Sequence, residues 1–309
     1  MQFDLSDDQR DLRDGIWSLL AGAFPIARVR NGFDRSMWDE LVEAGVFGLR
    51  ADGFTWADAA VVFEELGRAV VPGPLVWGLL AYDPTRASRI VGGLERPEPG
   101  TPAMVEHLAV IDTLVVLDAD GVSEVDPSTV TGDVIDWPLD PLTPVTKVAE
   151  LPAGTRIARP RVAAEWMTQG AVLGAAYAVG MAEACTDLSV AYAKEREQFG
   201  RPIGSFQAVK HLCSDMAVRV EVARAATHAA AVHLDDPGLG GTERAVSGAK
   251  LLAGEAAILN GKSATQVHGG MGFTWEVDVH LYLKRAWVLD TVFGSGDSHA
   301  DAVAATLTS

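Results

Sequence analysis

The sequence contains little cysteine. Its 309 residues include only Cys185 and Cys213, and both lie in apolar patterns with helical spacing. Cysteines in such surroundings are expected to be buried thiols in a reducing compartment. The pattern argues against a metal-binding pair and against a catalytic thiol.

Positive charge is also scarce. The 42 Asp and Glu residues outnumber the 25 Lys and Arg residues, which gives a formal net charge of −17 at pH 7. This excess argues against a nucleic-acid partner and against binding to an anionic membrane surface. An anionic ligand must therefore be held by local positive groups that act against the overall field.

Long apolar runs are absent as well. The longest apolar stretch, from Ala69 to Tyr82, is short and contains Pro72 and Pro74, so it does not predict a membrane span. Residues 1–10 are acidic and lack the basic and apolar regions of a signal peptide. We therefore expect a cytoplasmic protein.

Helical periodicity is present at both ends of the chain. It predicts a mostly helical α+β fold with an N-terminal helical domain over residues 1–82 and a C-terminal four-helix bundle over residues 156–309. In the first part, Ser6 is a candidate N-cap of the first helix. In the second part, a long Ala- and Gly-rich helix is expected from about Val162 to Lys194, and a single final helix is expected after Thr274.

The residues between these helical parts have a different character. Pro, Gly, Asp and Thr separate short Val-rich runs, which predict strands over residues 108–111, 113–117 and 145–148. We expect a small, reduced β middle domain over residues 83–155. At about 70 residues it is shorter than the roughly one hundred residues of an ordinary domain.

The stretch from Tyr192 to His211 organises the rest of the sequence. A helix ends before Gly200, and a new helix is expected to begin after Gly204, with Ser205 as its N-cap. Arg196 and Gln198 then lie where a helix ends and a turn begins. Such a place suits a fixed donor pair that faces an anion, because the Arg guanidinium binds phosphate in a bidentate manner. A helix hairpin with a solvated arginine is the alternative that spacing alone favours.

Three segments resemble the acyl-CoA dehydrogenase family. Residues 196–211 are similar to the family signature, and residues 266–273 are similar to a second family element. A third resemblance lies near the start, where residues 3–9 and 62–69 look like the N-terminal helices of the family. The three segments occur in the family's order and spacing, at both ends of the chain.

The resemblance implies oxidation of a CoA thioester between Cα and Cβ, with a carboxylate base that removes the Cα proton and an FAD cofactor. The family places its glutamate base at one of two positions, which correspond here to Gly170 and Phe293. Neither is a carboxylate. The nearby carboxylates, which we interpret as surface groups and not as a base, are Glu165, Asp290 and Asp297.

The same resemblance implies that cofactor contacts are retained. In family dimers these segments reach across the interface to the FAD of the neighbouring subunit. Arg196 would meet the pyrophosphate, with Gln198 and Phe199 beside it. The residues expected along the adenosine half are Gln207, Gln266, Gly269 and Gly270. No metal ligands are expected.

These features together resemble the smaller, degenerate partner in the heterotetrameric acyl-CoA dehydrogenases of actinobacteria, which act on steroid side-chain or other bulky acyl-CoA thioesters. The resemblance implies that this chain shares FAD with a homologous subunit, has no catalytic residue of its own and is inactive in isolation. No stretch of the middle region resembles the family's Trp-Val-Thr-type motif, which contacts the flavin ring. A flavin-dependent monooxygenase on the same scaffold and a flavin-free scaffold protein are the alternatives.

Overall fold

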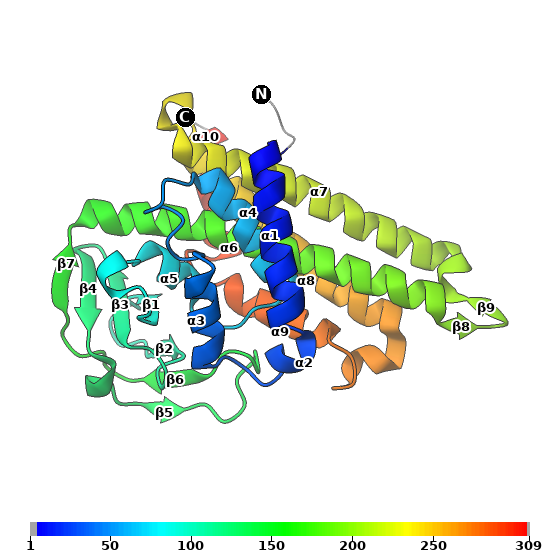
Figure 1. Cartoon of the computed structure of the whole chain (residues 1–309), viewed down its shortest axis with the longest axis horizontal. Coiled ribbons are helices and arrows are strands. Elements are labelled where there is room, and N and C mark those ends of the chain that lie inside the picture. The colour runs from blue at the N-terminus through cyan, green and yellow to red at the C-terminus, as the bar shows by residue number, and fades with distance from the viewer. Residues whose placement is uncertain (1–4, 308–309) are drawn as a thin grey trace. The chain divides into compact units, whose positions relative to one another are not determined.

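The computed structural model describes residues 5–307, so the first two residues of the segment that begins at Phe3 lie outside the described residues. The described chain is mostly helical, with two small sheets and a two-stranded hairpin (Figure 1). This confirms the predicted fold class. None of the helices in the described part of the chain is long and apolar enough to cross a membrane.

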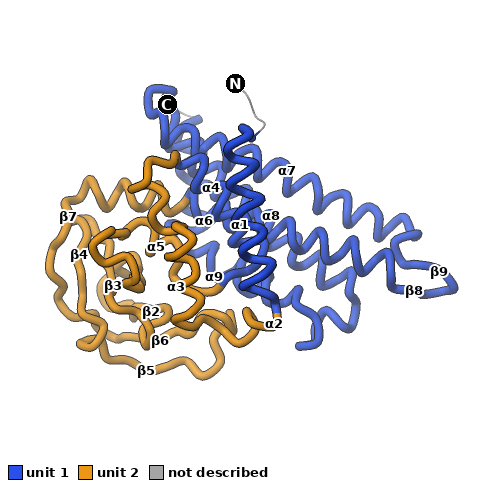
Figure 2. The backbone as a smooth tube through the Cα atoms, in the orientation of Figure 1, with its two compact units in different colours: residues 1–26, 56–71, 172–309 blue, residues 27–55, 72–171 orange. Residues whose placement is uncertain are grey.

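The chain divides into two compact units (Figure 2). Unit 1 consists of Met1–Ile26, Trp56–Val71 and Val172–Ser309, and unit 2 consists of Ala27–Thr55 and Pro72–Ala171. Several helices of the first 82 residues therefore group with the strands, and not with the first helix. The division into three domains at residues 82 and 155 stays a prediction.

Unit 1 is built from helices. They are α1 (Asp7–Ala23), α4 (Trp56–Arg68), most of α6 (Pro160–Glu195), α7 (Gln207–Asp235), α8 (Thr242–His268), α9 (Val279–Leu289) and α10 (Gly296–Leu307). Ser6 caps α1 as predicted, because its side chain accepts from the Gln9 N–H while the Gln9 side chain accepts from the Ser6 N–H. The cap of α4 comes from a distant residue, since the Asp235 carboxylate accepts the N–H groups of Trp56 and Ala57 at 2.8 and 3.0 Å.

A buried asparagine ties the three long helices of unit 1 together. The amide nitrogen of Asn260 on α8 donates to the carbonyls of Ala182 on α6 and Met216 on α7, at 3.2 and 3.0 Å. Its oxygen accepts from Arg219 at 3.1 Å. Because Asn260 is fully buried, these bonds fix how the three helices pack against one another.

The prediction of one final helix is wrong in detail. Two helices, α9 and α10, follow Thr274, and residues 290–295 separate them. Phe293 and Gly294 adopt φ angles of 57° and 88°, which a helix cannot contain. The chain therefore turns at Phe293, one of the two positions where the family resemblance places a glutamate base.

Unit 2 combines short helices with the sheets. The helical elements are α3 (Arg35–Glu43) and α5 (Leu75–Leu80), and α2 (Ile26–Val29) lies where the two units meet along the chain. One sheet has the order β1-β3-β4-β7 and the other the order β2-β6-β5. The strands are β1 (Val91–Glu95), β2 (Ala103–Glu106), β3 (Thr113–Asp118), β4 (Gly121–Val125), β5 (Asp133–Val134), β6 (Val145–Val148) and β7 (Thr155–Ala158).

Two of the three predicted strands are confirmed, as β3 and β6. The third, over residues 108–111, is wrong, because these residues form a turn after β2. His107 enters this turn with a φ of 55°, and its carbonyl accepts from the N–H of Val110 at 2.9 Å. The apolar run had indicated a strand, but the turn that begins at His107, just before the run, decides the local structure.

Candidate functional site

The segment that links α6 to α7 forms a small hairpin at one end of unit 1 (Figure 1). Its strands are β8 (Glu197–Gln198) and β9 (Arg201–Pro202). Phe199 and Gly200 close it with φ angles of 54° and 76°, and the side chain of Phe199 is 92% exposed. A left-handed conformation at a bulky residue is uncommon, and it is found where surrounding structure enforces it.

Arg196 lies at the base of this hairpin with its backbone held on both sides. Its N–H donates to the Tyr192 carbonyl at 2.8 Å, and its carbonyl accepts from the N–H of Ile203 at 2.8 Å. The side chain of Arg196 is exposed, and no carboxylate of the described residues 5–307 pairs with it. A fixed backbone with a free guanidinium is an arrangement suited to binding an anion.

The start of α7 differs from the prediction at its cap. Ser205 is not the N-cap, because a 3-10 helix over Ile203–Ser205 includes it and Phe206 takes the cap position without a side-chain hydrogen bond. Gln207 is the first residue of α7 and is exposed. A Cβ atom on Gly204 would lie 2.8 Å from the Ala193 carbonyl oxygen, which explains why glycine precedes this helix.

The end of α8 supplies the other predicted contact residues. Gln266 is exposed in the last turn, and α8 stops at Gly269, whose φ is 60°. A Cβ atom at Gly269 or at Gly270 would meet nothing within 4 Å. The backbone at this helix end is therefore open to a ligand that approaches closely.

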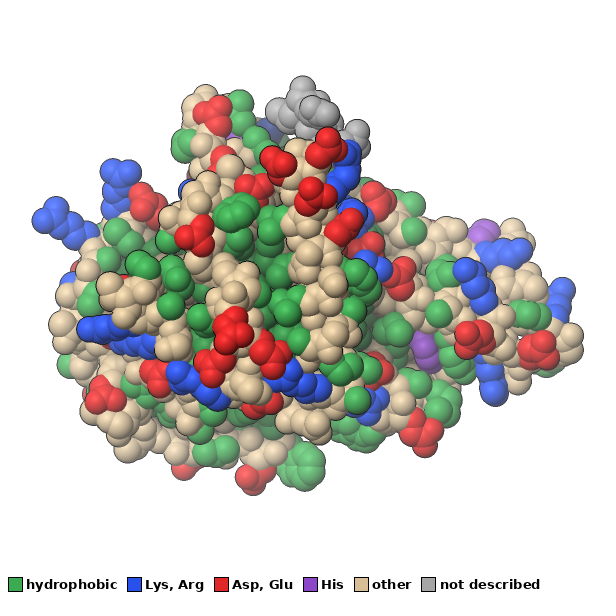
Figure 3. All heavy atoms as spheres, viewed as in Figure 1, with side chains coloured by type: hydrophobic (Ala, Val, Ile, Leu, Met, Phe, Trp, Pro, Cys, Tyr) green, Lys and Arg blue, Asp and Glu red, His purple; other side chains and the backbone are tan. Residues whose placement is uncertain are grey.

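An aromatic stack joins the two segments. The rings of Tyr192 on α6 and His268 on α8 lie 4.3 Å apart with an interplanar angle of 22°. His268 is buried, and its Nδ1 lies 2.8 Å from the Ala264 carbonyl, to which it donates. Because Tyr192 also accepts the N–H of Arg196, the hairpin and the end of α8 belong to one edge of unit 1, which we call the hairpin edge. It comprises residues 196–207 and 266–270, and Figure 3 shows basic and acidic side chains together at this end of the bundle.

The two positions where the family places its base hold no carboxylate. Gly170 lies within α6 and is buried. Phe293 is 1% exposed and left-handed, and its carbonyl accepts from Nε2 of His299 at 2.9 Å. The other ring nitrogen of His299 lies 3.1 Å from the Ser247 hydroxyl, so His299 holds the turn that buries the Phe293 ring.

Three carboxylates lie near these positions in the sequence, and each has a different local environment. Glu165 pairs with Arg161 at 2.8 Å on an exposed helix face, where their side chains are 45% and 89% exposed. Asp290 lies at the C-terminus of α9, and its Oδ1 is the atom closest to a Cβ built on Gly254, at 2.5 Å. Asp297 is exposed in the first turn of α10.

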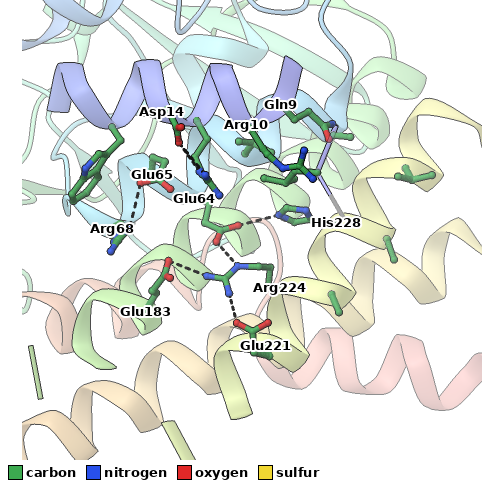
Figure 4. Close-up of a pocket in the computed structure, with 18 residues that line it drawn as sticks. Gln9, Arg10, Asp14, Glu64, Glu65, Arg68, Glu183, Glu221, Arg224 and His228 are labelled. Carbon is green, nitrogen blue, oxygen red and sulfur yellow. Dashed lines mark hydrogen bonds and ion pairs between the residues drawn. The ribbon is translucent and has the colours of Figure 1, made fainter. Parts of the chain in front are cut away.

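A cavity of about 760 Å³ lies within unit 1, between α1, α4, α6 and α7 (Figure 4). Glu64 has two partners in it, since it accepts from Arg224 Nε at 2.6 Å and lies 3.0 Å from His228 Nε2. Burial raises the pKa of Glu64, but the His228 hydrogen bond and the Arg224 charge outweigh it and hold this pKa below the ordinary value. Arg224 also pairs with Glu183 at 2.9 Å and with Glu221.

The neighbouring carboxylate, Glu65, lacks the hydrogen-bond partners that Glu64 has. Its side chain is 5% exposed, and its Oε2 has no hydrogen-bond partner in the described chain. Its ion-pair partner is Arg68, whose NH1 lies 3.9 Å from Oε2. Burial raises the pKa of Glu65 to about 7, and the Arg68 charge opposes that rise.

Sequence reasoning had assigned residues 62–69 only to a helix resembling the family. It missed the buried pair Glu64–Glu65 and their partners on α6 and α7. The sequence does contain a signal for this pair, because two successive glutamates interrupt a helix whose other residues from Ala59 to Leu66 are apolar. On a fully buried helix, such carboxylates need partners from other elements.

Comparisons with known proteins agree with this description. A family model described as acyl-CoA dehydrogenase, C-terminal domain, matches residues 161–308. The acyl-CoA dehydrogenase IpdE2 of Mycobacterium tuberculosis is 34% identical, and the match covers 91% of this chain and 91% of that protein.

Solved structures share the fold. A chain of the ChsE4-ChsE5 complex from Mycobacterium tuberculosis aligns over 100% of this chain and 99% of its own length, with a TM-score of 0.81 and 22% identity. A chain of a variant of the Tcur3481-Tcur3483 steroid ACAD aligns over 98% of this chain and 99% of its own length, with a TM-score of 0.81 and 21% identity. From the extent and identity of the match to IpdE2, the chain belongs to the acyl-CoA dehydrogenase family.

Proposed function

We propose that this chain is a subunit of an FAD-dependent acyl-CoA dehydrogenase that lends cofactor contacts to a homologous partner subunit and has no catalytic base of its own. The observation that carries the proposal is the contrast between two parts of unit 1. The hairpin edge keeps every predicted cofactor residue exposed on a fixed backbone, whereas the base position within this unit holds the buried ring of Phe293.

The hairpin edge fits the phosphate and adenosine half of FAD. The guanidinium of Arg196 is free to donate to a pyrophosphate, and a charge-assisted, bidentate contact of this kind is among the stronger polar interactions. Gly269 and Gly270 leave room for close backbone approach, and the side chains of Gln266 and Gln207 are exposed. Gln198 and the exposed ring of Phe199 complete the set at the hairpin tip.

The α,β-desaturation typical of the family needs a base that takes the Cα proton. Bound FAD would serve as the acceptor of the hydride from Cβ. Neither Gly170 nor Phe293 can take a proton. The nearby Glu165 is turned to solvent and paired with Arg161, which supports its role as a surface residue. We therefore assign the proton transfer to the partner subunit and the holding of the cofactor's phosphates to Arg196 of this chain.

The partner is proposed to be a homologous acyl-CoA dehydrogenase subunit. Two solved structures with this fold are named as pairs of proteins, ChsE4-ChsE5 and Tcur3481-Tcur3483, and the second is named a steroid ACAD. These names, together with the missing base, support a hetero-oligomer and a bulky or steroid-derived acyl-CoA substrate. The middle region, which lacks a stretch resembling the flavin-ring motif, supports the same division of roles.

Flavin stoichiometry tests this proposal. The chain is purified alone and after co-expression with the homologous subunit, and bound FAD is measured by absorbance after release. We expect no stoichiometric FAD in the isolated chain and about one FAD per pair of unlike chains in the complex. A yellow homo-oligomer with one tightly bound FAD per chain would overturn the proposal.

A further inference from the structure

The cavity between α1, α4, α6 and α7 is lined by charged groups that do not balance. Five carboxylates face four guanidinium groups and one imidazole. The carboxylates are those of Asp14, Glu64, Glu65, Glu183 and Glu221. The basic groups are those of Arg10, Arg13, Arg68, Arg224 and His228. The carboxylates of the pocket therefore outnumber its guanidinium groups by one.

The positive groups of the pocket are already engaged. Arg224 pairs with three carboxylates, and Arg68 donates to Asp187 at 2.8 Å. Arg10 and Arg13 pair with Asp7 and Asp14. An anion that entered would have to displace these partners, so the charge distribution does not favour an anionic ligand.

Glu65 is the group in the pocket that lacks a hydrogen-bond donor and that a ligand could therefore bind. In the described chain neither of its oxygens takes part in a hydrogen bond, and Arg68 approaches only to 3.9 Å. A buried carboxylate without donors is costly, because ionisation there is not compensated by water or by a close partner. Oε2 is closed off from solvent, so Oε1 is the oxygen that a molecule in the pocket would meet first. A donor carrying one positive charge would satisfy both the missing hydrogen bond and the missing charge.

The size and the walls of the pocket indicate what kind of cation fits. The volume of about 760 Å³ is that of a small-molecule site and far exceeds a bare ion. No group of three or more His, Cys, Asp and Glu side chains in residues 5–307 could hold a metal ion. Apolar side chains, among them Trp17, Val61 and Val232, line the pocket beside the charges and can cover an alkyl body.

We propose that this pocket binds a small organic monocation, a primary alkylammonium compound, whose ammonium group pairs with the Glu65 carboxylate and whose alkyl body packs against Trp17 and Val61. The pocket shares no residue with the hairpin edge. Binding here is therefore a second ligand function of unit 1, and it does not depend on the proposed lending of FAD contacts.

Calorimetric titration of the full chain with n-hexylammonium chloride tests the proposal at pH 8 and pH 6. An alkylammonium group, like the Lys side chain, keeps its charge up to about pH 10, so a difference between these pH values reports the protein. We expect saturable binding at pH 8 that weakens at least several-fold at pH 6, where the raised pKa of Glu65 leaves this carboxyl protonated. The uncharged n-hexanol, of nearly the same shape, should bind at least about tenfold more weakly at pH 8.

Variants separate Glu65 from other carboxylates of the chain. Glu65→Gln should weaken n-hexylammonium binding at least about tenfold at pH 8 and abolish the difference between pH 6 and pH 8. Glu255→Gln removes an exposed carboxylate on α8 that does not line the pocket, and it should leave binding within about threefold. Absence of saturable binding to the wild-type chain would overturn the proposal. So would equal binding of n-hexanol, or a pH dependence that persists in the Glu65→Gln variant.

Discussion

Gly180 on α6 lies against the backbone of α4 at Glu64: a Cβ atom on Gly180 would sit 1.8 Å from the Glu64 carbonyl oxygen. The contact is reciprocal, because a Cβ atom on Gly67 would sit 1.9 Å from the Tyr177 carbonyl oxygen. The two helices therefore cross with their backbones in contact. This crossing places the side chain of Glu64 within reach of Arg224 and His228 on α7.

Adding a methyl group at this crossing should destabilise unit 1. Gly180→Ala forces the backbones of α4 and α6 apart, and we expect a loss of about 3 kcal/mol or more in the free energy of unfolding. Gly174→Ala is the matched control on the same helix, since its Cβ atom would meet Leu289 and Lys250 only at ordinary contact distances of 3.8 and 4.0 Å. The control should be neutral or stabilising by up to about 1 kcal/mol, because Ala favours helix over Gly. Equal unfolding midpoints for the two variants in denaturant would contradict this packing.

Glu65 should make stability depend on pH. Its pKa of about 7 in the folded chain lies above the ordinary value of 4.5, so the folded state binds the proton more tightly than the unfolded state. The stabilisation of the protonated form is complete below about pH 4.5 and is lost as the pH rises through about 7. Glu65→Gln cannot ionise. It should therefore match the wild type near pH 4 and exceed its stability at pH 8 by about 3 kcal/mol, at about 1.4 kcal/mol per pKa unit.

Denaturant unfolding at several pH values measures this difference. Glu255→Gln, at an exposed position on α8, serves as the control and should change stability by no more than about 0.5 kcal/mol. If Glu65→Gln is less stable than the wild type at pH 8, the prediction is contradicted. The folded chain would then stabilise the ionised form of Glu65 more strongly than its pairing with Arg68 explains.

Much of the fold was predictable from local signals. The helix stripes, the N-cap at Ser6 and the break at Gly200 depend on residues close in the sequence, and the structure confirms them. The turn at His107, the left-handed Phe293 and the cap of α4 by Asp235 depend on tertiary contacts that periodicity does not contain. The same limit explains why the Glu64 network was missed, since its partners come from Glu183 on α6 and from Arg224 and His228 on α7.

The remaining carboxylates near the base positions should be dispensable for turnover. In the complex with the homologous subunit, Glu165→Gln, Asp290→Asn and Asp297→Asn introduced together should leave kcat for the acyl-CoA within a few fold. Removal of a true general base costs about 10²–10⁴-fold, so the two outcomes are well separated. Flavin spectrum and assembly size are checked alongside. A loss of a hundredfold or more with both intact would mean that this chain supplies the base.

The central claim is that Arg196 holds the phosphates of FAD for a partner subunit, and FAD dissociation from the complex tests it most directly. A charge-assisted hydrogen bond contributes about 1.5–3 kcal/mol, so Arg196→Ala should weaken FAD retention on the order of tenfold or more without unfolding the complex. Arg196→Lys should also be impaired, because a point charge does not reproduce the planar fork. Arg201→Ala removes a guanidinium of the same hairpin that lies over the Phe206 ring at 4.2 Å, and it should retain FAD as the wild type does. Unchanged FAD dissociation in a folded, assembled Arg196→Ala complex would contradict the account.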